Sequence, residues 1–175
     1  MKYENFNDAE ALKIAVNIEE EGLEFYSTLM KSARDREVKE IFSKLASEEK
    51  EHLARFQKAL LEITDSASKT QGCEDYTVDL YLKYLVDTGV FTQKGEAKRI
   101  ALEIKTDIDA LRIGIQAEKD SILYYTEAAK NTKYPAGKMA LEQLANEEKK
   151  HLKLLAEQLK ALKHANKITE NIGGQ

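Results

Sequence analysis

The sequence LASEEKEHL at residues 45–53 returns as LANEEKKHL at residues 144–152, 99 positions later (144 − 45). Each copy contains a Glu-x-x-His pair, Glu49 with His52 and Glu148 with His151. Because residues three apart on an α-helix lie on nearly the same face, each pair can present a carboxylate and an imidazole to one metal ion. Two such pairs in one chain indicate a site for two metal ions.

The repeat extends well beyond these two motifs. Residues 14–60 align with residues 113–159 at the same offset of 99 (113 − 14), without insertion or deletion. Each half is therefore predicted to form a helical hairpin, and the chain to be a duplicated unit. The alignment pairs Glu19 with Glu118, Tyr26 with Tyr125 and Leu60 with Leu159.

Apolar residues at steps of three and four predict four long helices. Thr106-Asp107-Ile108-Asp109 resembles a capping box with Asp in place of Glu, and Pro135 suits the first position of a helix. The predicted helices cover about 8–34 and 35–63 in hairpin one (about 8–63), and about 106–130 and 135–164 in hairpin two (about 106–164).

The connection between the hairpins, from about 65 to 105, is predicted to contain two short helices. They lie around 78–87 and 95–104 and are separated by Thr88-Gly89. A connection of this length can run along a bundle, so the second and third long helices are expected to be parallel. The predicted fold is an all-α four-helix bundle with one long crossover, in a single domain over residues 1–175.

The composition agrees with a helical protein and excludes several classes of function. One proline and eight glycines leave few helix breaks in 175 residues. Charged residues make up 33% with both signs interspersed, and the net charge is −4, which disfavours a nucleic-acid partner. Residues 1–13 are not typical of a signal peptide, and no apolar stretch is long enough to span a bilayer. We expect a cytoplasmic protein without a membrane or nucleic-acid partner.

Four glutamates are predicted to point into the core, one from each long helix. Glu19, for example, has apolar or small residues at helical spacing, and a buried carboxylate is costly unless it is paired or bound to a cation. Glu19 lies 15 residues before Arg34 (34 − 19) and Glu49 lies 14 after Asp35 (49 − 35). At about 1.5 Å per residue the two are level in an antiparallel hairpin, and the repeat gives hairpin two the same geometry.

With the two histidines, these residues form a ligand set suited to two iron ions, and manganese or zinc also accepts such ligands. The alternative for the Glu-x-x-His pairs is a solvated charged face, which the matching inward glutamates disfavour. Glu48 and Glu147 lie four residues before each His and are interpreted as flanking residues that could compete for ligation. The predicted ligands are Glu19, Glu49, His52, Glu118, Glu148 and His151.

Other polar residues are given ordinary roles. Tyr26 and Tyr125 are either core aromatics or neighbours of the metal ligands. Glu20, Glu21 and Glu24 are predicted to form a mostly solvated face. His164 is predicted to lie on the surface and Cys73 to be an ordinary thiol.

These motifs resemble those of the ferritin-like diiron carboxylate proteins, and within them the rubrerythrin-related group. The likeness covers both EExxH cores, the segments IEEEGLEFY and AEKDSILYY, and YLKYLVDTGVFT in the crossover. It implies a ferritin-like bundle in which the six residues above bind two iron ions, with Tyr26 and Tyr125 in the second shell. Rubrerythrins proper have a further Glu at the position of Ser121 and a Cys-rich rubredoxin domain, whereas this sequence has one cysteine.

The resemblance implies a non-haem diiron oxidoreductase that reduces dioxygen or hydrogen peroxide. Its electrons would come from an external donor such as a rubredoxin or a ferredoxin. One alternative is a ferroxidase or iron-handling protein, which would need a hollow cage; no clear fifth helix follows His164. Another is a structural bundle with a vestigial site. The exposed faces of four long helices make a homo-oligomer plausible.

Overall fold

The computed structural model describes residues 7–65 and 76–173, and within them the chain is folded into six helices without a strand. The four long helices are the predicted ones, and two shorter helices lie in the connection between the hairpins. In chain order they are α1 (Asp8–Ser32), α2 (Arg36–Asp65), α3 (Tyr76–Asp87), α4 (Glu96–Glu103), α5 (Asp107–Asn131) and α6 (Pro135–Gly173).

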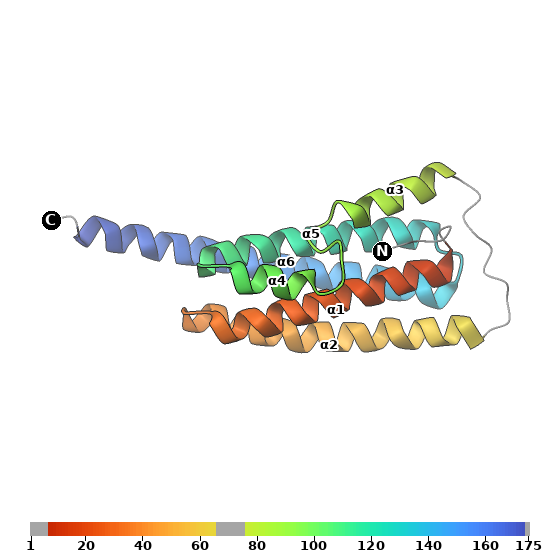
Figure 1. Ribbon diagram of the computed structural model, residues 1–175, viewed down its shortest axis with the longest axis horizontal. Coiled ribbons are helices and arrows are strands. Elements are labelled where there is room, and N and C mark those ends of the chain that lie inside the picture. The colour runs from red at the N-terminus through yellow and green to blue at the C-terminus, as the bar shows by residue number, and fades with distance from the viewer. Residues whose placement is uncertain (1–6, 66–75, 174–175) are drawn as a thin grey trace.

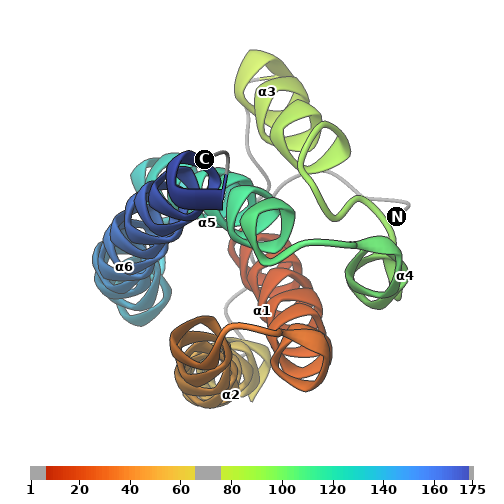
Figure 2. The ribbon, with the colours of Figure 1, turned by 90° about the vertical axis from the view of Figure 1, so that its left-hand side faces the viewer.

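The long helices form a four-helix bundle of two antiparallel hairpins, α1 with α2 and α5 with α6 (Figure 1). Helices α2 and α5 run in the same direction, as the length of the crossover predicted. Seen from the end, α4 lies beside α1 and α3 beside α5, so the crossover covers the α1/α5 side of the bundle (Figure 2). The all-α, one-crossover architecture is confirmed.

The helix boundaries follow local sequence signals. Asn7 caps α1 by accepting a hydrogen bond from the Glu10 amide, and Thr106 caps α5 through the Asp109 amide. Pro135 is the first residue of α6, as expected. The predicted end of this helix near His164 is wrong: α6 continues to Gly173, because no glycine or proline interrupts the sequence between these two positions.

Each hairpin caps the turn of the other. The Asp107 carboxylate, at the start of α5, accepts hydrogen bonds from the amides of Arg34 and Asp35 in the α1–α2 turn, at 2.7 to 3.2 Å. The Asp8 carboxylate, at the start of α1, accepts from the amides of Lys133 and Tyr134 in the α5–α6 turn, both at 3.0 Å. These groups obey the offset of 99 (107 − 8, 133 − 34), so the repeat extends to the contacts that join the hairpins.

The hydrophobic core consists of two clusters, one toward each end of the bundle. One cluster contains Leu12, Phe56 and Tyr125, and the other contains Phe25, Phe42 and Leu155. The inward glutamates and both histidines of the repeated motifs occupy the layer between them and are each at most 5% exposed. Packing on both sides therefore fixes the height of this polar layer.

The prediction that Glu21 belongs to a solvated face is wrong, since its side chain is buried. Its two carboxylate oxygens accept hydrogen bonds from the amides of Gly95, at 2.7 Å, and Ala97, at 2.9 Å, at the start of α4. Gly95 has a φ of 82°, a conformation that glycine adopts without strain. The crossover thus docks on α1 through a carboxylate that accepts hydrogen bonds from otherwise unpaired amides at the start of α4.

The remaining predictions concern His164, Cys73 and membrane-spanning helices. His164 is exposed, as predicted. Cys73 lies outside the described residues. Within the described ranges, no helix combines the length and the apolar character needed to cross a bilayer.

Candidate metal centre

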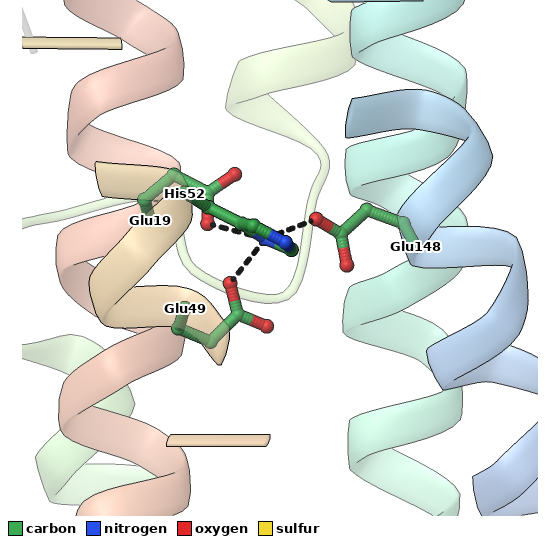
Figure 3. A group of neighbouring side chains, drawn as sticks. All are labelled: Glu19, Glu49, His52 and Glu148. Atoms are coloured by element: carbon green, nitrogen blue, oxygen red, sulfur yellow. Dashed lines mark ion pairs between the residues drawn. The ribbon is translucent and has the colours of Figure 1, made fainter. Parts of the chain in front are cut away.

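Six side chains from the four long helices converge in the polar layer. Glu19 comes from α1, Glu118 from α5, and the two Glu-x-x-His motifs contribute one pair each from α2 and α6. The structure thus brings together all six residues that the sequence predicts as ligands. Figure 3 shows four of them pointing toward one another between the helices.

The imidazole of His52 directs its Nδ1 atom at three carboxylates. The distances from Nδ1 are 2.9 Å to Glu148, 3.4 Å to Glu49 and 3.6 Å to Glu19 (Figure 3). Glu148 comes from the opposite hairpin, so this group joins the two halves of the chain. One ligand atom from each of the four residues lies within 4.8 Å of the others.

The imidazole of His151 is placed in the same way. Its Nδ1 atom lies 2.7 Å from Glu148, 3.5 Å from Glu49 and 3.8 Å from Glu118. These four residues form a second group with ligand atoms within 4.8 Å. Glu49 and Glu148 belong to both groups, and each presents one oxygen to each imidazole. The geometry is that of two neighbouring cation positions joined by two shared carboxylates.

The other nitrogen of each imidazole faces a carboxylate of the opposite hairpin. His52 Nε2 lies 3.0 Å from Glu147, and His151 Nε2 lies 3.1 Å from Glu48. An outer carboxylate of this kind fixes the orientation of a metal-binding imidazole and leaves the opposite nitrogen for the metal. Glu48 and Glu147 therefore flank the cluster behind the histidines, as interpreted from the sequence.

The two tyrosines hold the carboxylates that are not shared. Tyr26 Oη donates a hydrogen bond to Glu118, and Tyr125 Oη donates one to Glu19 at 2.5 Å. Each bond crosses from one hairpin to the other. Gly114 permits the close approach of Tyr26, because a Cβ atom there would lie 3.3 Å from its hydroxyl oxygen. The prediction that these tyrosines lie beside the cluster agrees with the geometry.

The electrostatics show that the pKa values of two of the carboxylates and of both imidazoles are raised, so these groups hold their protons more tightly than in water. Burial and the charge of Glu49 raise the pKa of Glu19 well above its ordinary value, and burial and Glu148 do the same for Glu118. Burial disfavours charged imidazoles, but Glu148 and the other carboxylates outweigh it and raise the pKa of His151 to about 11. The pKa of His52 is raised for the same reasons. The cluster retains protons unless another cation neutralises it.

Several buried ligand atoms face one another in the cluster and make no hydrogen bond to a group outside it. They are Oε2 of Glu19, both carboxylate oxygens of Glu148, and Nδ1 of His52 and His151. Buried polar atoms without partners are rare and call for an explanation, such as a bound ion. All five face the shared centre of the two groups, and four carboxylates balance the charge of two divalent cations. The donor set therefore fits two metal ions.

Sequence reasoning missed three polar contacts, one beside this centre and two that join other elements of the bundle. Arg55 binds the outer carboxylate of Glu147 at 2.9 Å, and Glu21 and Asp107 cap distant backbone amides. The Asp107 contact could have been predicted from the repeat, since Asp8 and Asp107 also match at the offset of 99. No comparable signal existed for Glu21, because its partners lie in the crossover, which has no counterpart in the repeat.

Comparisons with known proteins agree with this geometry. A crystal structure of a candidate ferritin-like diiron-carboxylate protein from Thermotoga maritima matches with a TM-score of 0.65 and 23% sequence identity, over 91% of this chain and 98% of that chain. This likeness shows a ferritin-like fold. The search among curated proteins gives no significant match. The rubrerythrin family profile matches residues 10–90 and 109–173, which include all six converging residues, and the chain therefore belongs to the rubrerythrin family.

Proposed function

We propose that this protein is a non-haem diiron oxidoreductase that reduces dioxygen or hydrogen peroxide. The observation that carries the proposal is the sharing of Glu49 and Glu148 between two four-residue groups whose imidazole Nδ1 atoms face these carboxylates and make no hydrogen bond outside the cluster. Membership of the rubrerythrin family and the fold shared with a candidate diiron-carboxylate protein support iron as the metal.

One ion would be held by Glu19 and His52 and the other by Glu118 and His151, with Glu49 and Glu148 common to both. Carboxylate and imidazole ligands suit iron and also accept manganese or zinc. Two ferrous ions bound here would supply two electrons to a small oxidant.

The chain's own residues prepare the site for such chemistry. Glu48 and Glu147 orient the imidazoles, and Tyr26 and Tyr125 hold the unshared carboxylates in place. The apolar clusters above and below the polar layer exclude bulk water, which strengthens the attraction between carboxylates and cations.

The electrons are proposed to come from an external donor. The sequence contains a single cysteine, too few for a rubredoxin-type iron site of four thiolates. A small redox protein such as a rubredoxin or a ferredoxin therefore completes the proposed cycle.

Anaerobic titration with Fe(II), followed by metal analysis, tests the proposal. Binding of two irons per chain, with magnetic coupling in the Mössbauer spectrum after exposure to dioxygen or peroxide, is the expected result. Regeneration of the ferrous state by reduced rubredoxin tests the donor. Binding of no metal, or only at the exposed histidine His164, would contradict the proposal. Continued uptake of iron beyond two per chain by a large assembly would indicate iron handling instead.

A further inference from the structure

Two small cavities lie on the side of the cluster that the crossover covers. The inner cavity has a volume of about 20 Å³ and lies against Glu19, Glu49 and Glu118. The outer cavity has a volume of about 40 Å³ and lies beneath residues 89–91, which connect α3 to α4 and are partly exposed. A cavity of about 10–15 Å³ holds one water molecule, so each of these cavities has room for a small molecule.

The two cavities are neighbours. Ile18, Phe91, Ala117 and Ser121 form part of the wall of both. These shared side chains therefore lie at the boundary between the outer cavity and the inner one. Phe91 belongs to the connection between α3 and α4, so the aromatic ring at this boundary comes from a loop and not from a helix of the bundle.

The walls of the outer cavity favour an uncharged, weakly polar occupant. Its three polar side chains are already engaged: Asp120 accepts from the Val90 amide at 2.9 Å, Ser121 Oγ donates to the Ala117 carbonyl, and Tyr124 Oη donates to the Ala11 carbonyl. The other side chains in the wall are apolar. Cavities lined in this way hold water poorly and take up apolar molecules.

A departure from the repeat creates this space. Ala117 occupies the position in hairpin two that Ile18 occupies in hairpin one (18 + 99), and both residues line both cavities. An isoleucine at position 117 would fill much of the volume between them.

The opposite side of the cluster has a different character. A groove of about 640 Å³ runs over α2 and α6, and its wall includes the buried imidazoles of His52 and His151. Charged and strongly polar solutes are therefore expected to approach from this side. The charged residues in its wall are Lys44, Arg55, Lys149, Lys150 and Lys153 together with Glu48, Glu51, Glu147 and Glu157.

We propose that the outer and inner cavities form a passage that brings a small uncharged molecule of the size of dioxygen to the carboxylate side of the cluster. The role of that molecule as oxidant rests on the proposed function, but the existence of the passage does not. Ala117 and Phe91 are the residues that determine its width.

Xenon binding to the metal-free protein tests the passage independently of any metal. Crystals pressurised with xenon are expected to show xenon between Phe91 and Ala117, with little or none in Ala117→Ile. Ile18→Ala should retain or increase the occupancy, and Ala161→Ile, the same change at an exposed position of α6, should leave it unaltered. Absence of xenon from the wild type, or equal occupancy in Ala117→Ile, would overturn the proposal. Thermal unfolding of each variant verifies that it is folded.

The rates of oxidation of the iron-loaded protein test what the passage carries. Ala117→Ile is expected to slow oxidation by dioxygen by about tenfold or more, an increase of about 1.4 kcal/mol in the barrier. Oxidation by hydrogen peroxide, which is strongly polar and can enter by the groove, should change much less. If xenon binds but neither rate changes, the passage does not serve dioxygen and that part of the proposal is wrong. If no iron binds, the proposed function fails while the xenon result still decides whether the passage exists.

Discussion

The two hairpins are alike at the positions that build the centre and differ at positions that surround it. The cross-hairpin contacts occur in matched pairs, for example Tyr26 to Glu118 and Tyr125 to Glu19. By contrast, Ala117 replaces Ile18, and Leu154 occupies the position of Arg55. The comparison teaches that a duplicated sequence produces a symmetric cluster, whereas access to the cluster and its outer charges depend on where the duplication has been altered.

The largest expected effect distinguishes the shared carboxylates from the unshared ones. Glu148→Gln replaces one of the two shared oxygens with an amide and removes the negative charge that both groups use. Binding of both metal ions should therefore be lost or should weaken by more than the roughly 10- to 100-fold that is typical for loss of an outer partner. Glu118→Gln affects one group and should retain one ion. Anaerobic calorimetric titration with metal analysis measures both, with Glu49→Ala expected to resemble the Glu148 variant.

Thermal unfolding followed by circular dichroism shows whether these variants are folded without metal. Glu118→Gln relieves repulsion between carboxylates, so this metal-free variant should unfold at the wild-type temperature or above it. Glu148→Gln loses the partner of both imidazoles, so this metal-free variant should unfold at a lower temperature. Two metal ions bound to Glu148→Gln with wild-type affinity would refute the assignment of Glu148 as a shared ligand.

The pH dependence of stability should differ between the metal-free and the metal-loaded protein. The folded-state pKa of His151 is raised from 6.5 to about 11, so its stabilising contribution is complete below pH 6.5 and disappears as the pH rises through about 11. The raised pKa values of Glu19 and Glu118 act in the same direction above pH 4.5. The metal-free protein should therefore melt at a lower temperature at about pH 10 than at about pH 6.

Metal ions require deprotonated ligands, so the metal-loaded protein should gain stability relative to the metal-free form as the pH rises. Differential scanning calorimetry of both forms gives the comparison. A metal-free protein that is more stable at alkaline pH would show that the cluster does not hold the protons assigned to it.

The tyrosine hydroxyls provide a test of how equivalent the hairpins are. Tyr26→Phe and Tyr125→Phe each leave a buried carboxylate without its donor, so each should destabilise the metal-free protein by about 1–3 kcal/mol. Urea unfolding measures the free energy change. Tyr124→Phe, which loses a bond to a backbone carbonyl away from the cluster, is the control and should leave metal affinity unchanged. A large difference between the two variants would mean that the hairpins are not equivalent at the cluster.

The reciprocal caps should each make a smaller contribution. Asp8→Ala and Asp107→Ala remove acceptors from the two turns and should each reduce the free energy of unfolding by about 0.5–2 kcal/mol. The two sites lie at opposite ends of the bundle, so the double variant should be additive within about 0.5 kcal/mol (Figure 1). A strongly non-additive result would indicate that the ends of the bundle are coupled.

The smallest expected effect concerns Arg55. Although burial opposes it, Arg55 lowers the pKa of Glu147 and shares the carboxylate that holds His52. Arg55→Leu introduces the residue that the other hairpin has at position 154. Without the competing guanidinium, Glu147 should interact more strongly with His52, and one of the two metal affinities should rise by up to about tenfold. Mn(II) titration at low salt measures this, with Leu154→Arg as the converse variant. Unchanged affinities in both would show that the outer charge has no influence.

Much of this molecule could be predicted from its sequence because the signals are periodic. Steps of three and four residues gave the long helices, and the offset of 99 gave the hairpins. Nearly equal distances from the turn placed Glu19 level with Glu49. The starts of α5 and α6 could also be predicted, from the capping residue Thr106 and from Pro135. The end of α6 was predicted too early, since a helix without a Gly or Pro has no sharp stop in its sequence.

Other features depended on the tertiary structure, because they join segments that no period relates. Glu21 has the sequence context of a solvated residue, and it is buried only because the crossover docks on α1 there. The passage beneath Phe91 likewise requires the connection between α3 and α4 to lie over Ala117. The amino-acid sequence by itself determined the helices, the duplication and the six converging side chains, since these follow from spacing along the chain. The folded chain decided which carboxylates are shared and which side of the cluster is apolar, because both depend on how separate helices pack.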